Sequence, residues 1–69
     1  MARMRGPSGR EIFIEIVTIG VYAKVSAIDS ETGIEVSVTG PANGTRDTLE
    51  SAAVAKLEYV LKKQDPESH

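Results

Sequence analysis

Three segments rich in β-branched residues precede the one segment of the chain that has helical periodicity. Residues 11–19 and 21–28 are separated by Gly20, and residues 34–39 alternate between apolar and polar side chains. Runs of this kind, separated by short glycine-containing turns, are typical of antiparallel hairpins. The order therefore predicts an α+β fold, a two-layer β-β-β-α arrangement in which a three-stranded antiparallel meander carries one C-terminal helix packed on one face.

The parity of side chains in the two hairpins predicts which face of the sheet is buried. We place Ile19 and Gly20 at the centre of the first turn, and residues 30–33 in a four-residue loop with Gly33 left-handed at its end. Because side chains alternate between the faces of a strand, both hairpins then put their apolar residues on the same side. These residues are Ile12, Ile14, Ile16, Val21, Ala23, Val25, Ala27, Ile34, Val36 and Val38.

The helix is predicted to begin after Asp47, which is a plausible N-cap. Glu50 follows three residues later and completes a variant of the capping box. Lys62 and Lys63 lie near the end, where positive charge suits the helix dipole. Apolar residues at helical spacing mark the side expected to face the sheet, namely Leu49, Ala52, Ala53, Leu57, Val60 and Leu61.

Both ends of the chain have the composition of disordered segments. Residues 1–9 show no periodicity, include Arg3 and Arg5, and end with the run Gly6, Pro7, Ser8 and Gly9. We therefore predict a disordered basic head over residues 1–9, a single domain over residues 10–64 and a disordered tail over residues 65–69.

The composition excludes several classes of site. The chain has 69 residues and no cysteine, and its single histidine is residue 69, so we expect no disulfide, no metal site and no cofactor. No apolar run approaches the roughly 18 residues of a membrane span, and no signal peptide is recognisable, so we expect a cytoplasmic protein. The formal net charge of −2 argues against nucleic acid as the main ligand.

The face of the sheet that the helix leaves open is unusually apolar for a solvated surface. One helix cannot shield both sides of a sheet, and a chain this short buries only about 60% of its unfolded surface. We expect the chain to form a homodimer, either face to face or by pairing strand edges. Binding of another protein, or a harmless scatter of apolar residues, are the alternatives. The candidate interaction residues are Phe13, Val17, Ile19, Tyr22 and Ile28.

The glycine-containing loop between the last strand and the helix is a candidate anion site. Gly44 and Thr45 precede a helix N-terminus, where free backbone N–H groups attract anions. The spacing does not match a phosphate-binding loop, and Asp47 and Glu50 would compete for the same N–H groups. We therefore expect a plain joint between strand and helix. The remaining carboxylates are expected to be surface acids, and the chain is not expected to be an enzyme.

Short motifs spread over residues 10–63 resemble those of a known family: residues 25–29 (VSAID), 32–33 (TG), 35–37 (EVS), 40 (G) and 56–61 (KLEYVL). The family consists of very short bacterial proteins known only as a domain of unknown function. Some members carry the name serine hydroxymethyltransferase, but a chain of this length cannot house that enzyme. The resemblance implies a bacterial cytosolic protein and supplies no activity or site.

The β-β-β-α order is also similar to the C-terminal part of a double-stranded RNA-binding domain. Such domains place a basic cluster at the start of this helix to meet phosphates. Here residues 45–50 contain one arginine against two acids, and the first helix of that fold is missing. An RNA-binding module that uses Arg3, Arg5, Arg10 and Lys24 is therefore the alternative function to protein–protein interaction.

Overall fold

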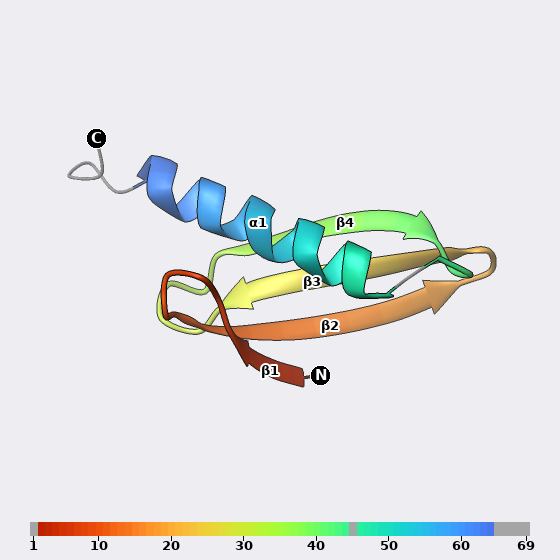
Figure 1. Ribbon diagram of the computed structural model, residues 1–69, viewed down its shortest axis with the longest axis horizontal. Coiled ribbons are helices and arrows are strands. Elements are labelled where there is room, and N and C mark those ends of the chain that lie inside the picture. Colours follow the sequence, from red (N-terminus) through yellow and green to blue (C-terminus); the bar gives the residue numbers. More distant parts are fainter. Residues whose placement is uncertain (1, 45, 65–69) are drawn as a thin grey trace.

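The computed structural model describes residues 2–44 and 46–64, so the predicted tail lies outside the described residues. An antiparallel sheet has the strand order β1-β2-β3-β4, and the helix α1 crosses one of its faces (Figure 1). The α+β class is confirmed, but the prediction of three strands is wrong, because the sheet has four. The elements are β1 (Ala2–Arg5), β2 (Glu11–Ile19), β3 (Tyr22–Asp29), β4 (Glu35–Pro41) and α1 (Arg46–Gln64).

The additional strand, β1, comes from the segment that was predicted to be a disordered head. Met4 pairs with Ile12 and Arg3 with Phe13, so Met4 lies on the helix side and Arg3 on the open side. The turn is closed by hydrogen bonds from Gly6 N–H to Arg10 O (2.8 Å) and from Gly9 N–H to Gly6 O (2.9 Å). Pairing with β1 satisfies backbone N–H and C=O groups along the edge of β2. The composition of residues 1–9 gives no sign of this pairing.

The turn between β1 and β2 is attached to the helix. The Glu58 carboxylate accepts hydrogen bonds from the Ser8 backbone N–H (3.1 Å) and from the Ser8 hydroxyl (2.8 Å). Gly6 is buried beneath this contact, and a Cβ at its position would lie 2.6 Å from atoms of both Ile12 and Glu58. The sheet and the helix are therefore joined by polar contacts as well as by the core.

The β2–β3 hairpin is shifted by two residues from the predicted register. Ile19 pairs with Tyr22, so Gly20 and Val21 form the turn, and Gly20 has a φ of 58°. This places glycine first in the turn, as a type II′ turn requires, whereas the predicted register needed a positive φ at the β-branched Ile19. A shift of two residues keeps every strand side chain on its predicted face. Val21, predicted to be buried, is instead 74% exposed.

The β3–β4 hairpin has the predicted register. Val25 pairs with Val38, and Ala27 pairs with Val36. Gly33 has a φ of 76°, and its N–H donates to Asp29 O at 2.9 Å. The four-residue loop over residues 30–33 is thus confirmed.

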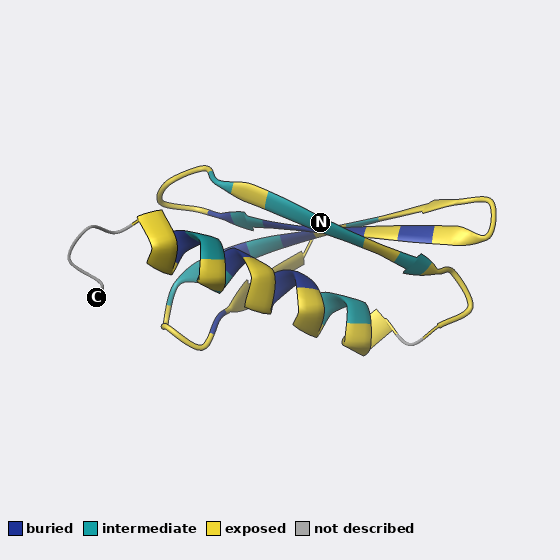
Figure 2. Cartoon of the chain, turned by 90° about the horizontal axis from the view of Figure 1, so that it is seen from above, coloured by how far each residue is buried: buried dark blue, intermediate teal, exposed yellow. Residues whose placement is uncertain are grey.

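The helix packs over β3 and β4 and completes one core (Figure 2). It begins at Arg46, so Asp47 lies in its first turn instead of serving as its N-cap. Of the predicted helical core, Ala52 is exposed and Val60 only partly buried, because the buried stripe is rotated to include Val54. The helix is not long and apolar enough to cross a membrane. The core cluster consists of Ile12, Ile14, Val25, Ala27, Ala53, Val54, Leu57 and Leu61.

Candidate interaction surface at the hairpin end

The β2–β3 hairpin extends beyond the start of the helix and gives the molecule its elongated shape (Figure 1). The principal extents are 41 × 20 × 17 Å. Because the helix lies over the other part of the sheet, no described helix or strand covers either face at the end of this hairpin. Apolar side chains here stay exposed to solvent.

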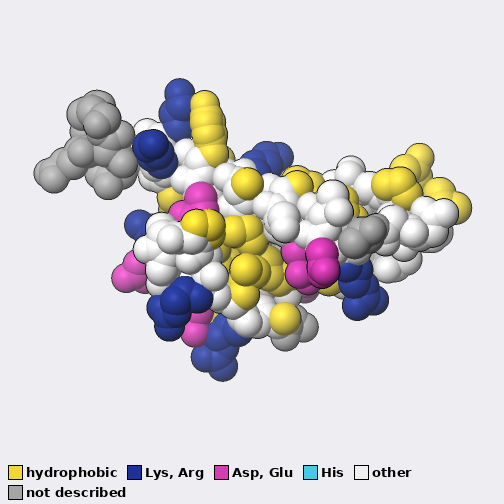
Figure 3. All heavy atoms as spheres, viewed as in Figure 1, with side chains coloured by type: hydrophobic (Ala, Val, Ile, Leu, Met, Phe, Trp, Pro, Cys, Tyr) yellow, Lys and Arg dark blue, Asp and Glu magenta, His cyan; other side chains and the backbone are white. Residues whose placement is uncertain are grey.

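Four apolar side chains gather at this end, and Figure 3 shows hydrophobic groups at the same end of the molecule. Val17 is 42% exposed, Ile19 66%, Val21 74% and Tyr22 64%. We call these four residues the hairpin-end surface. Three of them are predicted interaction residues. Val21 was missed, since parity assigned it to the core, and only the correct turn register would have revealed it.

The other two predicted interaction residues, Phe13 and Ile28, lie elsewhere on the open face. They pair directly with each other across β2 and β3, and both are partly buried. The Arg3 guanidinium lies 6.0 Å from the centre of the Phe13 ring, and it also pairs with Glu11 at 3.3 Å. A strand pair formed by Glu15 and Ser26 separates this cluster from the hairpin-end surface. The structure therefore divides the predicted patch in two.

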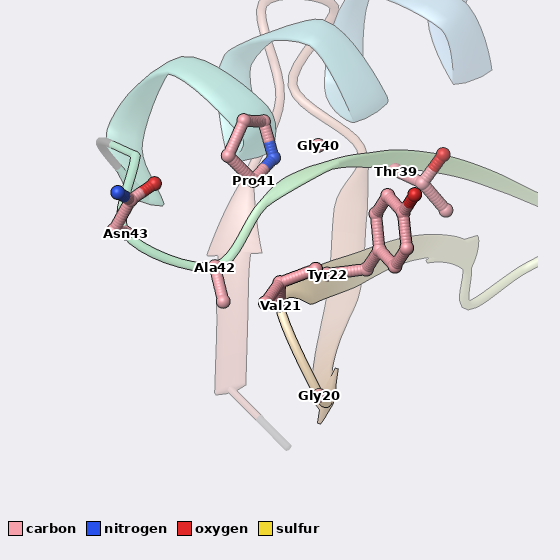
Figure 4. Close-up of a pocket in the computed structure, with 8 residues that line it drawn as sticks. All are labelled: Gly20, Val21, Tyr22, Thr39, Gly40, Pro41, Ala42 and Asn43. Carbon is pink, nitrogen blue, oxygen red and sulfur yellow. The ribbon is translucent and has the colours of Figure 1, made fainter.

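A shallow pocket of about 530 Å³ adjoins the hairpin-end surface where β4 leaves the sheet (Figure 4). The Tyr22 side chain extends along β4 on the same wall as Thr39. A hydrogen bond from Ala42 N–H to Val21 O (2.7 Å) fixes the loop against the turn. The remaining lining residues are Gly20, Gly40, Pro41 and Asn43. The lining is mostly apolar, so the pocket extends the same surface.

The predicted anion contact at Gly44 and Thr45 gains no support from the loop geometry. The Gly44 N–H donates to Pro41 O at 3.0 Å, so it is already used within the loop. Thr45 lies outside the described residues. Within residues 2–44 and 46–64, no three acidic or histidine side chains lie close enough together to hold a metal ion.

The arginines of the predicted basic head make contacts within the domain. The Arg5 guanidinium donates to Gly9 O at 2.7 Å. Arg10 pairs with Asp29 at 3.1 Å and with Glu31 at 3.3 Å. Together with the Arg3–Glu11 pair, these contacts place carboxylates beside two of the arginines proposed for RNA. Lys24 is exposed on the open face. RNA binding through these residues stays a prediction.

Asp29 is the buried centre of a polar cluster that sequence reasoning missed. Its side chain is 0% exposed, and its Oδ2 atom accepts hydrogen bonds from Thr32 N–H (2.9 Å), the Thr32 hydroxyl (2.8 Å) and Arg10. Burial by itself raises the pKa of Asp29, but the Thr32 hydrogen bonds and the Arg10 charge outweigh it, so the pKa lies below 3.8. The Asp-x-x-Thr spacing was the available signal, because Asp side chains cap turns in this way. We assign this cluster to the stability of the β3–β4 loop.

The fold and its exposed end define a class: a small α+β domain in which one helix covers part of a four-stranded sheet and an apolar hairpin end stays bare. The chain belongs to the family described as a domain of unknown function, DUF6898, whose model matches residues 9–64. The predicted resemblance is thereby confirmed, and β1 lies outside the matched segment. Neither a curated protein nor a solved structure shows significant similarity to the chain.

Proposed function

We propose that this domain is a non-catalytic protein-interaction module that forms a homodimer through the hairpin-end surface. The observation that carries the proposal is the clustering of four large apolar side chains, each at least 42% exposed, at the end of one hairpin. Apolar groups that are contiguous and exposed mark interaction sites, whereas isolated ones do not.

Two further features support self-association over a small-molecule site. The pocket beside Tyr22 is shallow and lies on the outer surface, so it offers a contact area to a protein more readily than an enclosed ligand cavity. The lowered pKa of Asp29 is explained by its contacts with Thr32 and Arg10, and this residue ends β3 at the opposite end from the hairpin-end surface. The lowered pKa of Asp29 therefore indicates a structural role and not a catalytic one.

The substitution Ile19→Glu should weaken the dimer. Ile19 is 66% exposed, so its replacement leaves the core intact but puts a charge in the middle of the hairpin-end surface. Loss of a central apolar anchor usually lowers association free energy by about 2 kcal/mol, which raises the dimer dissociation constant by roughly thirtyfold. Sedimentation equilibrium over a range of concentrations measures this change.

Tyr59→Glu is the matched control. Tyr59 is also a large exposed side chain, at 55%, but it lies on the outer side of α1, and Lys63 approaches its ring at 5.4 Å. We expect its dissociation constant to equal that of the parent chain. A parent chain that is monomeric at every concentration, or an Ile19→Glu variant as dimeric as the parent, contradicts the proposal.

A further inference from the structure

The outer edge of β2 is bare along the part that reaches the hairpin end. The last described pair between β1 and β2 joins Ala2 to Ile14, so no described strand continues beside residues 15–19. These residues read Glu-Ile-Val-Thr-Ile, a run with strong preference for β structure. A strand edge of this kind is a template for another strand.

The hydrogen-bonding direction of each residue on this edge follows from contacts further along β2. Glu11 O accepts from Ser30 N–H (3.2 Å), on the side of β3, whereas Arg10 O accepts from Gly6 N–H, on the side of β1. Because these directions alternate along a strand, Ile16 and Thr18 point their N–H and C=O groups outward. The bare edge therefore offers two residues with free donors and acceptors.

The other long edge of the sheet is less suited to pairing. On β4 the alternation places the groups of Ser37 and Thr39 outward, and the Lys56 ammonium already donates to Ser37 O at 3.2 Å. Pro41, at the end of the same edge, has no N–H. A side chain that bonds to an edge carbonyl, or a proline that lacks the N–H, keeps another strand from pairing with that edge. Among the described residues, the bare part of β2 has neither.

The bare segment is complementary to itself. If two copies run antiparallel about a twofold axis at Val17, each Ile16 lies opposite the Thr18 of the other copy. Both residues point outward, so they form hydrogen-bonded pairs, while Val17 faces Val17 in a pair without hydrogen bonds. Glu15 then lies opposite Ile19, so no like charges meet.

An axis midway between two residues would instead oppose an outward-pointing residue to one that already bonds to β3. An axis at Ile16 would place Thr18 opposite Ile14, which already pairs with Ala2. An axis at Thr18 would place Ile16 opposite Gly20 in the turn.

We propose that two copies of this chain pair their β2 strands over residues 15–19, with the twofold axis at Val17, to form one continuous sheet. This inference rests on the proposed function, since it specifies how the homodimer is built. Both helices lie on the same side of the joined sheet. On the opposite side the β2 residues of the two hairpin-end surfaces meet, which covers Val17 of each copy and brings Ile19 beside the junction.

Cysteine cross-linking of the full chain tests this register, because the chain contains no cysteine of its own. Directly opposed side chains in pairs without hydrogen bonds come close enough to form a disulfide. Val17→Cys should cross-link under mild oxidation at least about tenfold faster than Tyr59→Cys, since paired thiols react at a millimolar effective concentration. Glu15→Cys alone and Ile19→Cys alone should stay near the Tyr59→Cys rate, whereas an equimolar mixture of the two should give the mixed disulfide.

Proline substitution supplies a second, independent test. Thr18→Pro removes an outward N–H and should abolish the dimer, while Thr39→Pro, on the outer edge of β4, should leave it unchanged. Circular dichroism checks whether each variant is folded. If one of the proline variants is unfolded, the cross-linking result decides whether β2 pairs with β2. A dimer in which Val17→Cys cross-links no faster than Tyr59→Cys overturns the β2 pairing but leaves the homodimer standing. A monomeric parent chain overturns both.

Discussion

Replacing Leu57 by alanine should lower the free energy of unfolding by about 3 kcal/mol. The Leu57 side chain is 0% exposed and belongs to the cluster that joins the helix to the sheet. Its truncation removes buried apolar surface and leaves a cavity that rigid neighbours fill only in part. A domain of this length has a total stability of roughly 3–10 kcal/mol, so this single change brings it near its unfolding limit. Urea denaturation followed by circular dichroism measures the loss.

Leu49→Ala is the matched control for Leu57. Both leucines lie on the predicted apolar stripe, but Leu49 is only partly buried, where α1 approaches Gly40. We expect it to lower the free energy of unfolding by clearly less than Leu57→Ala. Equal losses at the two positions would contradict the deeper burial of the Leu57 side chain in the core.

The second large effect is expected for Asp29→Asn, which should cost about 2 kcal/mol at neutral pH. All three donors to Asp29 converge on Oδ2, and Oδ1 is buried with no partner among the described residues. In the variant the amide oxygen must take the Oδ2 position, so the amide NH₂ occupies the unpartnered one. A buried donor is then left unsatisfied, and the attraction to Arg10 is lost.

The same variant should also change how stability depends on pH. The folded-state pKa of Asp29 lies below the ordinary 3.8, so the carboxylate contributes its full stabilisation above about pH 5. That contribution is lost as the pH falls through the folded-state pKa, because the native state then binds the proton that the unfolded state already holds. The difference in unfolding free energy between the parent and Asp29→Asn should therefore be constant from neutral pH to about pH 5 and shrink below 3.8.

Glu31→Gln is the control for this pH effect. Glu31 also pairs with Arg10, at 3.3 Å, but its side chain is 76% exposed. Exposed ion pairs contribute less than about 1 kcal/mol, so the parent and this variant should have nearly parallel stability curves. A difference for Asp29→Asn that persists undiminished in acid would show that the Asp29 charge does not stabilise the loop.

The parity of apolar residues was enough to predict both faces of the three predicted strands, but not the register of the β2–β3 hairpin. Moving β3 by two residues against β2 leaves every side chain on its face, so parity cannot distinguish the two registers. The choice depends on whether glycine occupies the first or the second turn position. Weighing the cost of a positive φ at Ile19 would have selected the observed turn.

The strand β1 could not be predicted, because its four residues contain two arginines and are followed by Gly6 and Pro7. Its formation depends on a partner edge and on Ser8 reaching Glu58, which are properties of the folded molecule. The candidate surface could be predicted only in part, because it too depends on how the elements lie in the folded molecule. Sequence identifies apolar residues on an open face, but the pairing of β1 places Arg3 beside Phe13, so Phe13 is half-covered while Tyr22 is bare.

The contact between Ser8 and Glu58 has a consequence for the order in which the chain folds. The two residues are 50 positions apart, so this contact can form only after residue 58 has been synthesised. All three hairpins close through short local turns and can form before it, the first through Gly6 and Arg10. Attachment of the N-terminal turn to α1 is therefore a late step in folding, which ties the first hairpin to the last element of the domain.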